Sequence, residues 1–427
     1  MWILFVSLLV LTLVAMLIGK TYYYRINKKI EKGECLMLHD LYTPEGETLQ
    51  GTPWEIYPRP QLKRNSYVNL NGIWDFAVSE KETDPVFDQT IHVPFCPESL
   101  LSGLKMEVKP GSYLFYRRHF PMQKQDGRLL LHIGAADQIA DIYVNQNHCG
   151  NHIGGYNSFT VDITDSLKTG ENELVIRTFD DLRDKTLPYG KQTLKRGGMW
   201  YTPVSGIWQT VWLEYVPQNY IRELDIQVDM TCARITVTPA LSGKVYCKDH
   251  AYELHNGVAV VTPENPQLWS PENPYLYEFI VETEEDRVES YFALRQLSIQ
   301  KAGEYQRLCL NGEPVFFHGL LDQGYWPDGI YTPASEKAFA EDILEMKKLG
   351  FNTLRKHIKV EPEAFYYACD RLGMIVFQDM VNNSHYSFLK DTALPTIGIQ
   401  KKNDLRSHKN LASRKAFYEC MDATVKQ

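Results

Sequence analysis

Residues 350–380 read GFNTLRKHIKVEPEAFYYACDRLGMIVFQDM. Residues 351–354 and the apolar run 374–377 in this stretch are predicted to be strands. The segment between them has apolar residues at helical spacing, namely Phe365, Cys369 and Leu372. Pro362 suits the start of this helix and Gly373 its end. A strand, a helix and a second strand in this order predict a parallel βαβ unit.

The same alternation continues on both sides of this unit. Upstream, the apolar run 315–321 predicts a first strand, and residues 335–350 predict a helix that Gly350 ends. Downstream, residues 405–425 predict a third helix, whose apolar side would be formed by Leu411, Phe417 or Tyr418, Met421 and Val425. We therefore interpret residues 301–427 as the first part of a (β/α)8 TIM barrel, with about three βα units. A closed barrel takes about 250 residues, so the sequence predicts an incomplete one.

The chain before the barrel has the pattern of β-sandwiches. Between residues 54 and 217, short alternating polar and apolar runs are separated by Gly, Asn, Asp and Pro, which predicts a jelly-roll-like β-sandwich. Residues 218–300 contain further strand-like runs and are short enough for one immunoglobulin-like β-sandwich. The expected fold class is therefore multidomain, with β-sandwiches followed by an α/β part.

The first residues differ in kind from the rest. Residues 2–18 form an uncharged run of 17 residues, which would span about 26 Å as a helix. We interpret residues 1–20 as a transmembrane segment or signal anchor and residues 21–53 as a juxtamembrane linker. Basic residues after the run predict a single-pass, membrane-anchored protein whose globular part is cytoplasmic. The alternative is a signal peptide and a secreted or cell-surface protein.

The composition excludes several classes of partner. The formal net charge is -8 without a basic stripe, so the sequence does not predict nucleic-acid binding. Eight cysteines are spread along the chain without a C-x-x-C pair, unlike a zinc site or a disulfide scaffold. His385 has no clear carboxylate neighbour in the sequence, and we expect a lone surface histidine there. We therefore predict neither a metal nor a cofactor.

Motifs in all three regions resemble those of glycoside hydrolase family 2, the group of β-galactosidases, β-glucuronidases and β-mannosidases. In the first sandwich the resemblance rests on Leu70-Asn71-Gly72-Ile73-Trp74, Tyr116-Arg117-Arg118-His119-Phe120 and Gly154-Gly155-Tyr156. At the joints it rests on Ser205-Gly206-Ile207-Trp208 and Leu310-Asn311-Gly312-Glu313-Pro314, and in the barrel on Gly350-Phe351-Asn352, Arg355 and Cys369-Asp370-Arg371-Leu372-Gly373. The resemblance covers nearly everything after Trp54.

The resemblance implies a retaining β-glycosidase in carbohydrate metabolism. In such enzymes one Glu is the acid and base and a second Glu attacks the sugar, with the carboxyl groups about 5 Å apart. In the family the first Glu follows an Asn at the end of the fourth barrel strand. This sequence has no Asn-Glu dipeptide after Asn311, so we expect both catalytic positions to lie beyond Gln427. We therefore predict no catalytic residue within this chain, and we expect no turnover by the chain alone.

Candidate sugar-binding residues follow the barrel strands, because barrel sites form at the carboxyl ends of the strands. Arg355 matches a family arginine and could orient a carboxylate or a sugar hydroxyl, or pair with Asp379 after the third strand. His357 comes two residues after Arg355, whereas the family histidine comes three after, so a loop histidine bonded to the backbone is the alternative. Asp322 and Trp326 follow the first strand, where many β-galactosidases have a His-rich segment instead. Trp326 either stacks on a sugar or packs at the domain joint.

One candidate comes from the first sandwich. Asp180 resembles an acid that some β-galactosidases bring into the sugar pocket. The alternative is that Asp180 and Asp181 form a solvated turn. The expected partners are a β-glycoside and, through the N-terminus, a membrane. Family members also commonly assemble as oligomers, which makes a homo-oligomer a further expectation.

Three classes of function are compatible with these features. The first is an O-glycosyl hydrolase of the β-galactosidase type of which this sequence is a fragment, and it is our main prediction. The second is a non-catalytic carbohydrate-binding protein that uses the sandwiches and the barrel surface. The third is a membrane-tethered interaction module that recruits a partner through the open edge of the barrel sheet.

Overall fold

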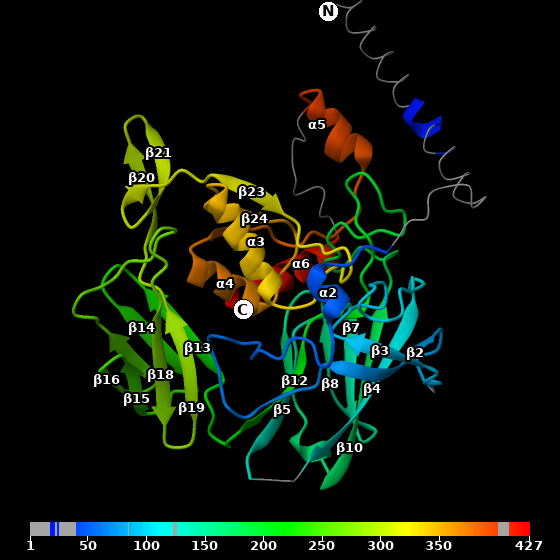
Figure 1. Cartoon of the computed structure of the whole chain (residues 1–427), viewed down its shortest axis with the longest axis horizontal. Coiled ribbons are helices and arrows are strands. Elements are labelled where there is room, and N and C mark those ends of the chain that lie inside the picture. Colours follow the sequence, from blue (N-terminus) through cyan, green and yellow to red (C-terminus); the bar gives the residue numbers. More distant parts are fainter. Residues whose placement is uncertain (1–17, 22–23, 25–39, 84, 123–125, 400–409) are drawn as a thin grey trace, which may run out of the picture. The chain divides into compact units, whose positions relative to one another are not determined.

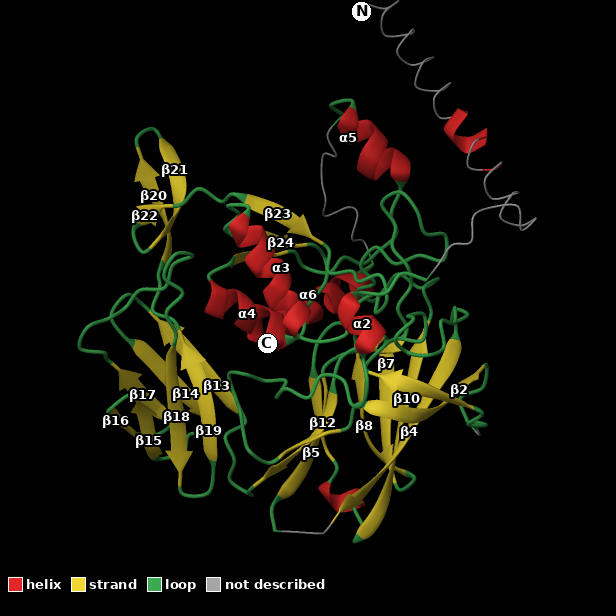
Figure 2. Ribbon diagram, in the orientation of Figure 1, coloured by secondary structure: helices red, strands yellow, loops and turns green. Residues whose placement is uncertain are grey.

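The computed structural model describes residues 18–21, 24, 40–83, 85–122, 126–399 and 410–427. The chain divides into two units, residues 1–41 and residues 42–427. In the first unit, residues 18–21 and 24 are helical. The fold and the site below belong to the second unit, whose elements are labelled in Figure 1. Strands dominate this unit, and Figure 2 shows helices mainly around the last parallel sheet.

The first sandwich contains a six-stranded antiparallel sheet with the order β3-β2-β4-β10-β7-β8. Its strands are β2 (Gly72–Ser79), β3 (Gln89–Val93), β4 (Ser112–Met122), β7 (Ile139–Val144), β8 (Asn147–Ile153) and β10 (Gly170–Asp180). Buried and less buried residues alternate along β7 and β10, because successive side chains of a strand point to opposite faces.

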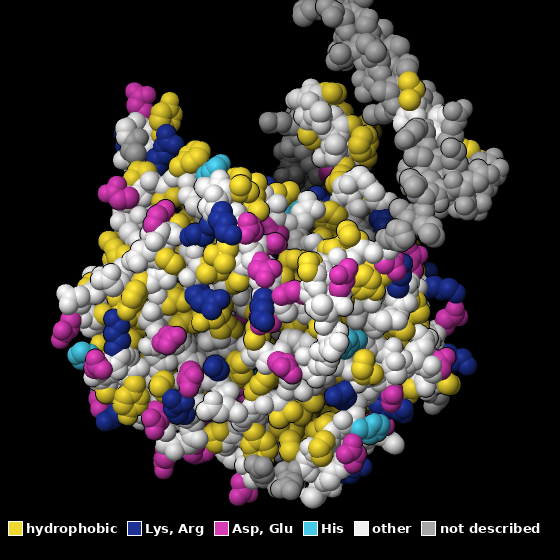
Figure 3. All heavy atoms as spheres, in the orientation of Figure 1, with side chains coloured by type: hydrophobic (Ala, Val, Ile, Leu, Met, Phe, Trp, Pro, Cys, Tyr) yellow, Lys and Arg dark blue, Asp and Glu magenta, His cyan; other side chains and the backbone are white. Residues whose placement is uncertain are grey.

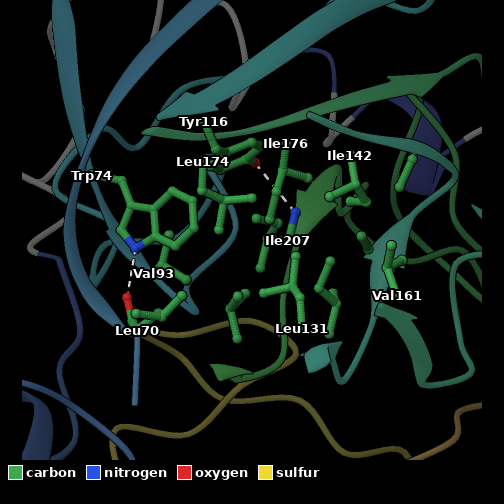
Figure 4. Packing of buried hydrophobic residues seen from close by; sticks show 14 of the residues in the cluster. Leu70, Trp74, Val93, Tyr116, Leu131, Ile142, Val161, Leu174, Ile176 and Ile207 are labelled. Carbon is green, nitrogen blue, oxygen red and sulfur yellow. Dashed lines mark hydrogen bonds between the residues drawn. The ribbon is translucent and has the colours of Figure 1, made fainter. Parts of the chain in front are cut away.

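The second sheet of this sandwich has the order β1-β12-β5-β9. Its strands are β1 (Tyr67–Asn69), β5 (Arg128–Ile133), β9 (Phe159–Asp162) and β12 (Val211–Val216). Apolar side chains of both sheets form one core, in which Trp74 donates to the carbonyl oxygen of Leu70 (Figure 4). A short pair, β6 (Ala136–Asp137) with β11 (Gly206–Ile207), and the turn η1 (Thr164–Ser166) complete the sandwich.

The second sandwich has the seven strands expected of an immunoglobulin-like domain. One sheet is β13-β14-β17 and the other is β16-β15-β18-β19. The strands are β13 (Glu223–Val228), β14 (Ala233–Thr238), β15 (Gly243–Cys247), β16 (His250–Leu254), β17 (Val258–Val261), β18 (Tyr277–Thr283) and β19 (Arg287–Phe292). Their inward side chains form a second core.

The barrel portion is a three-stranded parallel sheet with the order β23-β24-β25, as the sequence predicts. The strands are β23 (Gly319–Asp322), β24 (Thr353–Lys356) and β25 (Ile375–Gln378). Helices α3 (Lys337–Lys348) and α4 (Glu363–Leu372) contribute apolar side chains to its core. The described residues contain no closed barrel. Multidomain β and incomplete α/β architecture is thus confirmed, while the domain bounds 54–217, 218–300 and 301–427 stay predictions.

Two predicted strands begin later than expected. In the apolar run 315–321, β23 begins only at Gly319, because the N–H of Val315 still donates to the carbonyl oxygen of Leu308. Val315 thereby continues the pairing of β22 (Glu313–Pro314) with β21 (Tyr305–Leu310), which in turn pairs with β20 (Leu297–Ala302). Residue 351 does not start β24, because its backbone N–H donates to the carbonyl oxygen of Met346 and closes the end of α3. Such a turn after a helix uses the residue beyond the glycine.

The third predicted helix is present, but its predicted apolar side is only partly covered, since Phe417 and Met421 are half-buried. Helix α6 (Leu411–Lys426) begins after Asn410, which caps it, and residues 405–409 lie outside the described part of the chain. Leu411 and Val425 are both 74% exposed. Polar contacts hold the helix instead, including one from the Asn383 amide to the carbonyl oxygen of Ser413. Shorter helical segments are α2 (Pro44–Thr48), the π-helix η2 (Phe388–Ala393) and α5 (Leu394–Thr396).

The predicted membrane anchoring is contradicted. Within the described part of the chain, none of the helices is both long enough and apolar enough to cross a membrane. Residues 2–17 of the predicted segment lie outside the described residues. The single-pass, cytoplasmically oriented localisation is therefore withdrawn.

Candidate functional site

Parallel pairing brings polar side chains to one edge of the barrel sheet. Asp322 lies opposite Lys356 in the register of β23 and β24, and Arg355 lies opposite Phe377 of β25. Asp379 follows β25 directly and bonds through its backbone N–H to Lys356. Four of the predicted residues therefore gather at the carboxyl ends of the strands, and we call Asp322, Arg355, His357 and Asp379 the strand-end cluster.

Asp379 is held by two neighbours in this cluster. The Nε atom of Arg355 donates to both carboxylate oxygens, at 3.1 and 3.0 Å, and an outer guanidinium nitrogen lies 2.9 Å from Oδ2. Nδ1 of His357 lies 2.8 Å from Oδ2. Burial raises the pKa of Asp379, but the hydrogen bonds from Arg355 and His357 outweigh it and keep the pKa below its usual value. Asp379 is thus an ionised acceptor and not a proton donor.

A buried network of charged side chains adjoins the strand-end cluster. Nζ of Lys356 lies 2.6 Å from Asp322 and 2.9 Å from Glu361, and Nζ of Lys359 lies 2.8 Å from Glu361. Lys359 also donates to the carbonyl oxygens of Gly324 and Tyr331. Burial lowers the pKa of Lys359 to about 8, although Glu361 opposes that shift. Because all three donor positions of Lys359 are used, its role here is to tie loops together.

Sequence reasoning missed Lys356, Lys359 and Glu361. Both lysines are only 1% exposed and Glu361 is fully buried. Lysine and glutamate are almost never fully buried unless they are paired. The only signal in the sequence is the run of charges after β24, which equally suits a solvated loop. Burial of this kind depends on the sandwich and barrel loops that cover it.

A loop of the first sandwich forms a wall beside the strand ends. We call residues 185–201 the sandwich wall. The backbone N–H groups of Tyr189 and Gly190 donate to the carbonyl oxygen of Asn382, and the amide of Asn383 donates to the carbonyl oxygen of Thr186. These bonds attach the wall to the loop that follows β25.

Aromatic side chains join the wall to the same loop after β25 and to the loop after β23. Trp200 packs edge-on against Tyr386, with ring centroids 5.1 Å apart, and Tyr201 packs against Tyr325 at 4.9 Å. The ammonium group of Lys191, on the sandwich wall, adds a positive charge near the strand-end cluster. Burial lowers the pKa of Lys191, and the charge of Arg355 lowers it further. The charges of Lys191 and Arg355 therefore act on each other across the joint between the wall and the strand end.

Asp180 is buried rather than part of a solvated turn, and that alternative is wrong for this residue. Its Oδ2 atom lies 3.5 Å from the hydroxyl of Ser205, whose backbone N–H donates to Glu98. Burial raises the pKa of Asp180 to about 7 and that of Glu98 to about 8, and it raises the pKa of Asp137 well above its usual value. No contact among the described residues joins Asp180 to the strand-end cluster.

Trp326 is placed in the core of the barrel portion. Its ring packs edge-on against Phe339 of α3 at 6.2 Å, and Phe339 in turn meets Trp54 at 5.8 Å. This is the packing alternative that the sequence left open. Sugar stacking on Trp326 is not favoured by this position. The described residues also contain no group of three or more His, Cys, Asp or Glu side chains that could hold a metal ion.

Two family models match the chain. The model described as glycosyl hydrolases family 2 matches residues 229–295, which lie in the second sandwich. The model described as the glycosyl hydrolase 2 galactose-binding domain-like matches residues 101–209, which lie in the first sandwich.

Curated relatives are similar over most of this chain but are longer. A β-galactosidase of Thermoanaerobacter pseudethanolicus is 26% identical over 303 residues, which are 64% of this chain and 40% of that protein. A β-glucuronidase of Bacteroides fragilis is 22% identical over 352 residues, which are 73% of this chain and 49% of that protein. The chain therefore spans less than half the length of these two relatives.

Solved structures show the same fold. The β-D-glucuronidase of Dictyoglomus thermophilum has a TM-score of 0.68 at 19% identity, over 87% of this chain and 66% of that one. The β-glucuronidase of Ruminococcus gnavus has a TM-score of 0.66 at 18% identity, over 88% of this chain and 66% of that one. The two family models and the curated relatives show that the chain resembles glycosyl hydrolase family 2 in sequence, and the solved structures show that it shares their fold.

Proposed function

We propose that this chain supplies the sugar-recognition groups of a β-glycosidase that hydrolyses O-glycosidic bonds with retention of configuration. The observation that supports it is the clamp on Asp379, in which Arg355 and His357 hold one carboxylate at adjacent strand ends. A carboxylate fixed in this way is a ready acceptor for sugar hydroxyl groups. Arg355 keeps a side chain that is 56% exposed, and its free donors can bind a ligand above the strand ends.

The cluster is suited to binding and not to the chemical step. A retaining glycosidase needs a carboxylic acid that is still protonated at working pH, beside a second carboxylate about 5 Å away. The pKa of Asp379 is shifted the other way, and Asp322 is paired with Lys356. The catalytic glutamates of the proposed reaction are therefore other residues than these. We predict that the 427-residue chain alone does not hydrolyse nitrophenyl β-glycosides, and measured turnover by the purified chain would contradict this division of roles.

The charges around the cluster favour an acidic sugar. Asp322 is paired with Lys356, so Lys191 and Arg355 contribute two cations against the remaining carboxylate of the cluster, Asp379. A uronic acid carries a carboxylate that a guanidinium can bind through two parallel hydrogen bonds. A neutral hexose has no such anionic group. Solved relatives include β-glucuronidases, and the first strand lacks the His-rich segment expected of many β-galactosidases. We therefore propose β-glucuronides or related uronides as the glycone class.

Calorimetric titration of the full chain with methyl β-D-glucuronide and with methyl β-D-galactoside tests this proposal. We expect tighter binding of the uronide, and Arg355→Met should weaken it by about tenfold to a hundredfold because a charged hydrogen-bond partner is lost. Arg128→Met is the matched control, since Arg128 forms a similar surface pair with Asp162 at 2.8 Å on the first sandwich. Equal binding of both sugars, or equal loss in both variants, would exclude the uronide assignment.

A carbohydrate-binding protein without turnover is the second candidate. It is favoured by the pairing of each carboxylate in the strand-end cluster with a cation. The two candidates differ in a protein that also contains the rest of a family 2 barrel. Joining residues 1–427 to the remaining barrel units of a solved relative should give hydrolysis that depends on Arg355 if the first candidate is right, and binding alone if the second is.

A further inference from the structure

A groove of about 1040 Å³ lies away from the strand-end cluster, between the second sandwich and the outer helices of the barrel portion. Its floor is the segment that contains Ile56, Tyr57, Pro60 and Lys63. None of the residues of the strand-end cluster lines it. Sites for small molecules have volumes of about 300 to 1,000 Å³, so this groove has room for a ligand of several units.

One wall of the groove is the outer face of the sheet formed by β15, β18 and β19. The strand register aligns Tyr246, Ile280 and Glu289 in one row across the three strands. In the next row Glu278 lies opposite Tyr291, and Lys248 follows at the end of β15. The wall is thus a platform on which aromatic and charged side chains alternate.

The facing wall consists of one side of α3 and one side of α4. The residues of α3 are Lys337, Ala340, Glu341 and Leu344, and those of α4 are Ala364, Tyr367, Ala368 and Arg371. Each set has helical spacing, so each forms a single face. The alanines leave space between the helices and the sheet. Tyr367 packs on Tyr291 with ring centroids 4.9 Å apart, and so continues the aromatic surface across the groove.

The charges of the lining exclude several ligands. Four basic side chains, Lys63, Lys248, Lys337 and Arg371, face four acidic ones, Glu278, Glu289, Glu336 and Glu341. The face of the molecule drawn in Figure 3 likewise has basic and acidic side chains interspersed with hydrophobic ones. A nucleic acid or another polyanion needs a surface of one sign. The mixed charges of the lining therefore disfavour a polyanion as the occupant.

A peptide strand is also disfavoured. Residue 63 already pairs with the edge of the sheet, because its N–H donates to the carbonyl oxygen of Glu289 at 2.9 Å and its carbonyl oxygen accepts from the N–H of Glu289 at 2.9 Å. The edge of β19 is therefore occupied at this point and is closed to strand addition. What remains available is a set of side chains that donate and accept hydrogen bonds around the exposed ring of Tyr246 and the half-buried rings of Tyr57 and Tyr367.

We propose that this groove binds an oligosaccharide chain at a site separate from the strand-end cluster. Sugar rings present apolar faces that pack on tyrosine, while their hydroxyl groups both donate to carboxylates and accept from lysine and arginine. The balanced lining matches a ligand without net charge. Tyr246, which is 37% exposed, is the central contact. The inference is independent of the function proposed for the strand ends, because it uses none of the same residues.

Titration of the full chain with cellohexaose, xylohexaose and β-1,4-galactohexaose tests the groove. We expect at least one hexasaccharide to bind, and Tyr246→Ala to weaken its binding by about tenfold or more, as the loss of a central aromatic contact does. Tyr305→Ala is the matched control, because Tyr305 is a 66% exposed tyrosine on the hairpin of β20 and β21. Ala340→Trp should also abolish binding, because it fills the space beside α3.

The strand-end variant Asp379→Asn separates this site from the first one. Hexasaccharide binding that persists in Asp379→Asn and Tyr305→Ala but is lost in Tyr246→Ala and Ala340→Trp supports the groove. Binding that is lost in Asp379→Asn and kept in Tyr246→Ala would overturn it and leave the strand ends as the sugar site. Failure of all three hexasaccharides to bind would also overturn it, whatever the result with methyl β-D-glucuronide.

Discussion

The buried carboxyl group of Asp180 makes the stability of the folded chain depend on pH. Burial raises its pKa to about 7 in the folded chain, whereas an aspartate in an unfolded chain titrates near 4. Between these two values the folded state binds the additional proton. The free energy of unfolding therefore falls as the pH rises from about 4 to about 7, by up to about 1.4 kcal/mol per pH unit from this group.

Asp180→Asn should remove this share of the pH dependence. The amide cannot ionise, so we expect the variant to gain stability relative to the wild type as the pH rises from 5 to 8. Urea unfolding at pH 5, 6, 7 and 8 measures the difference. Asp181→Asn is the control, because Asp181 pairs with Arg183 and its pKa is lowered. An unchanged pH slope in Asp180→Asn would show that its carboxyl group is ionised in the folded state.

At the residue scale, the sequence predicted the position of residues that follow a strand directly, while their role in sugar binding stays a prediction. Arg355 and Asp379 end neighbouring parallel strands, so their meeting follows from the strand assignment alone. Asp180 could be identified as a candidate site residue only through the family resemblance. Its burial could not be predicted from the sequence. Burial of this carboxyl group depends on Ser205 and Glu98, which come from other parts of the sandwich.

At the scale of elements, the best predicted features are helix ends. Gly373 ends α4 in the left-handed conformation, with φ of 77°, and its N–H bonds to the carbonyl oxygen of Cys369. The exposed side of α6 could not be predicted, because helical spacing shows which residues share a face and not what that face contacts. The late start of β23 in the run 315–321 has the same cause, since the sequence does not show where a strand changes its partner.

Gly373→Ala should destabilise the chain through two additive effects. A methyl group in the left-handed conformation costs about 1–2 kcal/mol, and here it would also lie 2.4 Å from the carbonyl oxygen of Pro271. Gly303→Ala is the matched control, with φ of 65° and open space around the added carbon. We expect about 1 kcal/mol for the control and at least about twice that for Gly373→Ala by urea unfolding. Equal losses would show that α4 and Pro271 separate without cost.

At the scale of the whole molecule, one ionic network joins the two sandwiches. Arg64 donates to Glu214 of β12 at 3.1 Å and to Asp286 before β19 at 2.7 Å. Glu214 also accepts from Arg59 at 2.8 Å and lies 3.3 Å from His132. Burial raises the pKa of Glu214, but the hydrogen bond from His132 and the two arginines outweigh it and bring the pKa to about 2.

Glu214→Gln should destabilise the junction strongly. It leaves the buried guanidinium of Arg64 and the partly buried one of Arg59 without their shared anion, and breaking a buried pair in this way costs about 3–5 kcal/mol. Glu253→Gln is the control, since Glu253 forms an exposed cross-strand pair with Lys244 at 3.5 Å and should cost less than about 1 kcal/mol. Urea unfolding compares the two. A loss below 1 kcal/mol for Glu214→Gln would mean that the sandwiches are held by their apolar contacts alone.

The order of the domains is the whole-molecule feature that the sequence predicted best. Motifs at the joints between the domains, such as Ser205-Gly206-Ile207-Trp208, indicate this order. The sandwich wall could not be predicted, because Tyr189 and Asn382 are almost two hundred residues apart and neither belongs to a motif. Contacts between loops of different domains leave no periodic signal in the chain.

The attachment of the sandwich wall to the loop after β25 limits how relatives of this protein can be recombined. A chimaera that takes residues 185–201 from one parent and residues 382–386 from another replaces only one side of the bonds from Gly190 to Asn382 and from Asn383 to Thr186. Grafts that exchange specificity between related proteins should therefore transfer residues 185–201 and 382–386 together, although the two segments lie in different domains.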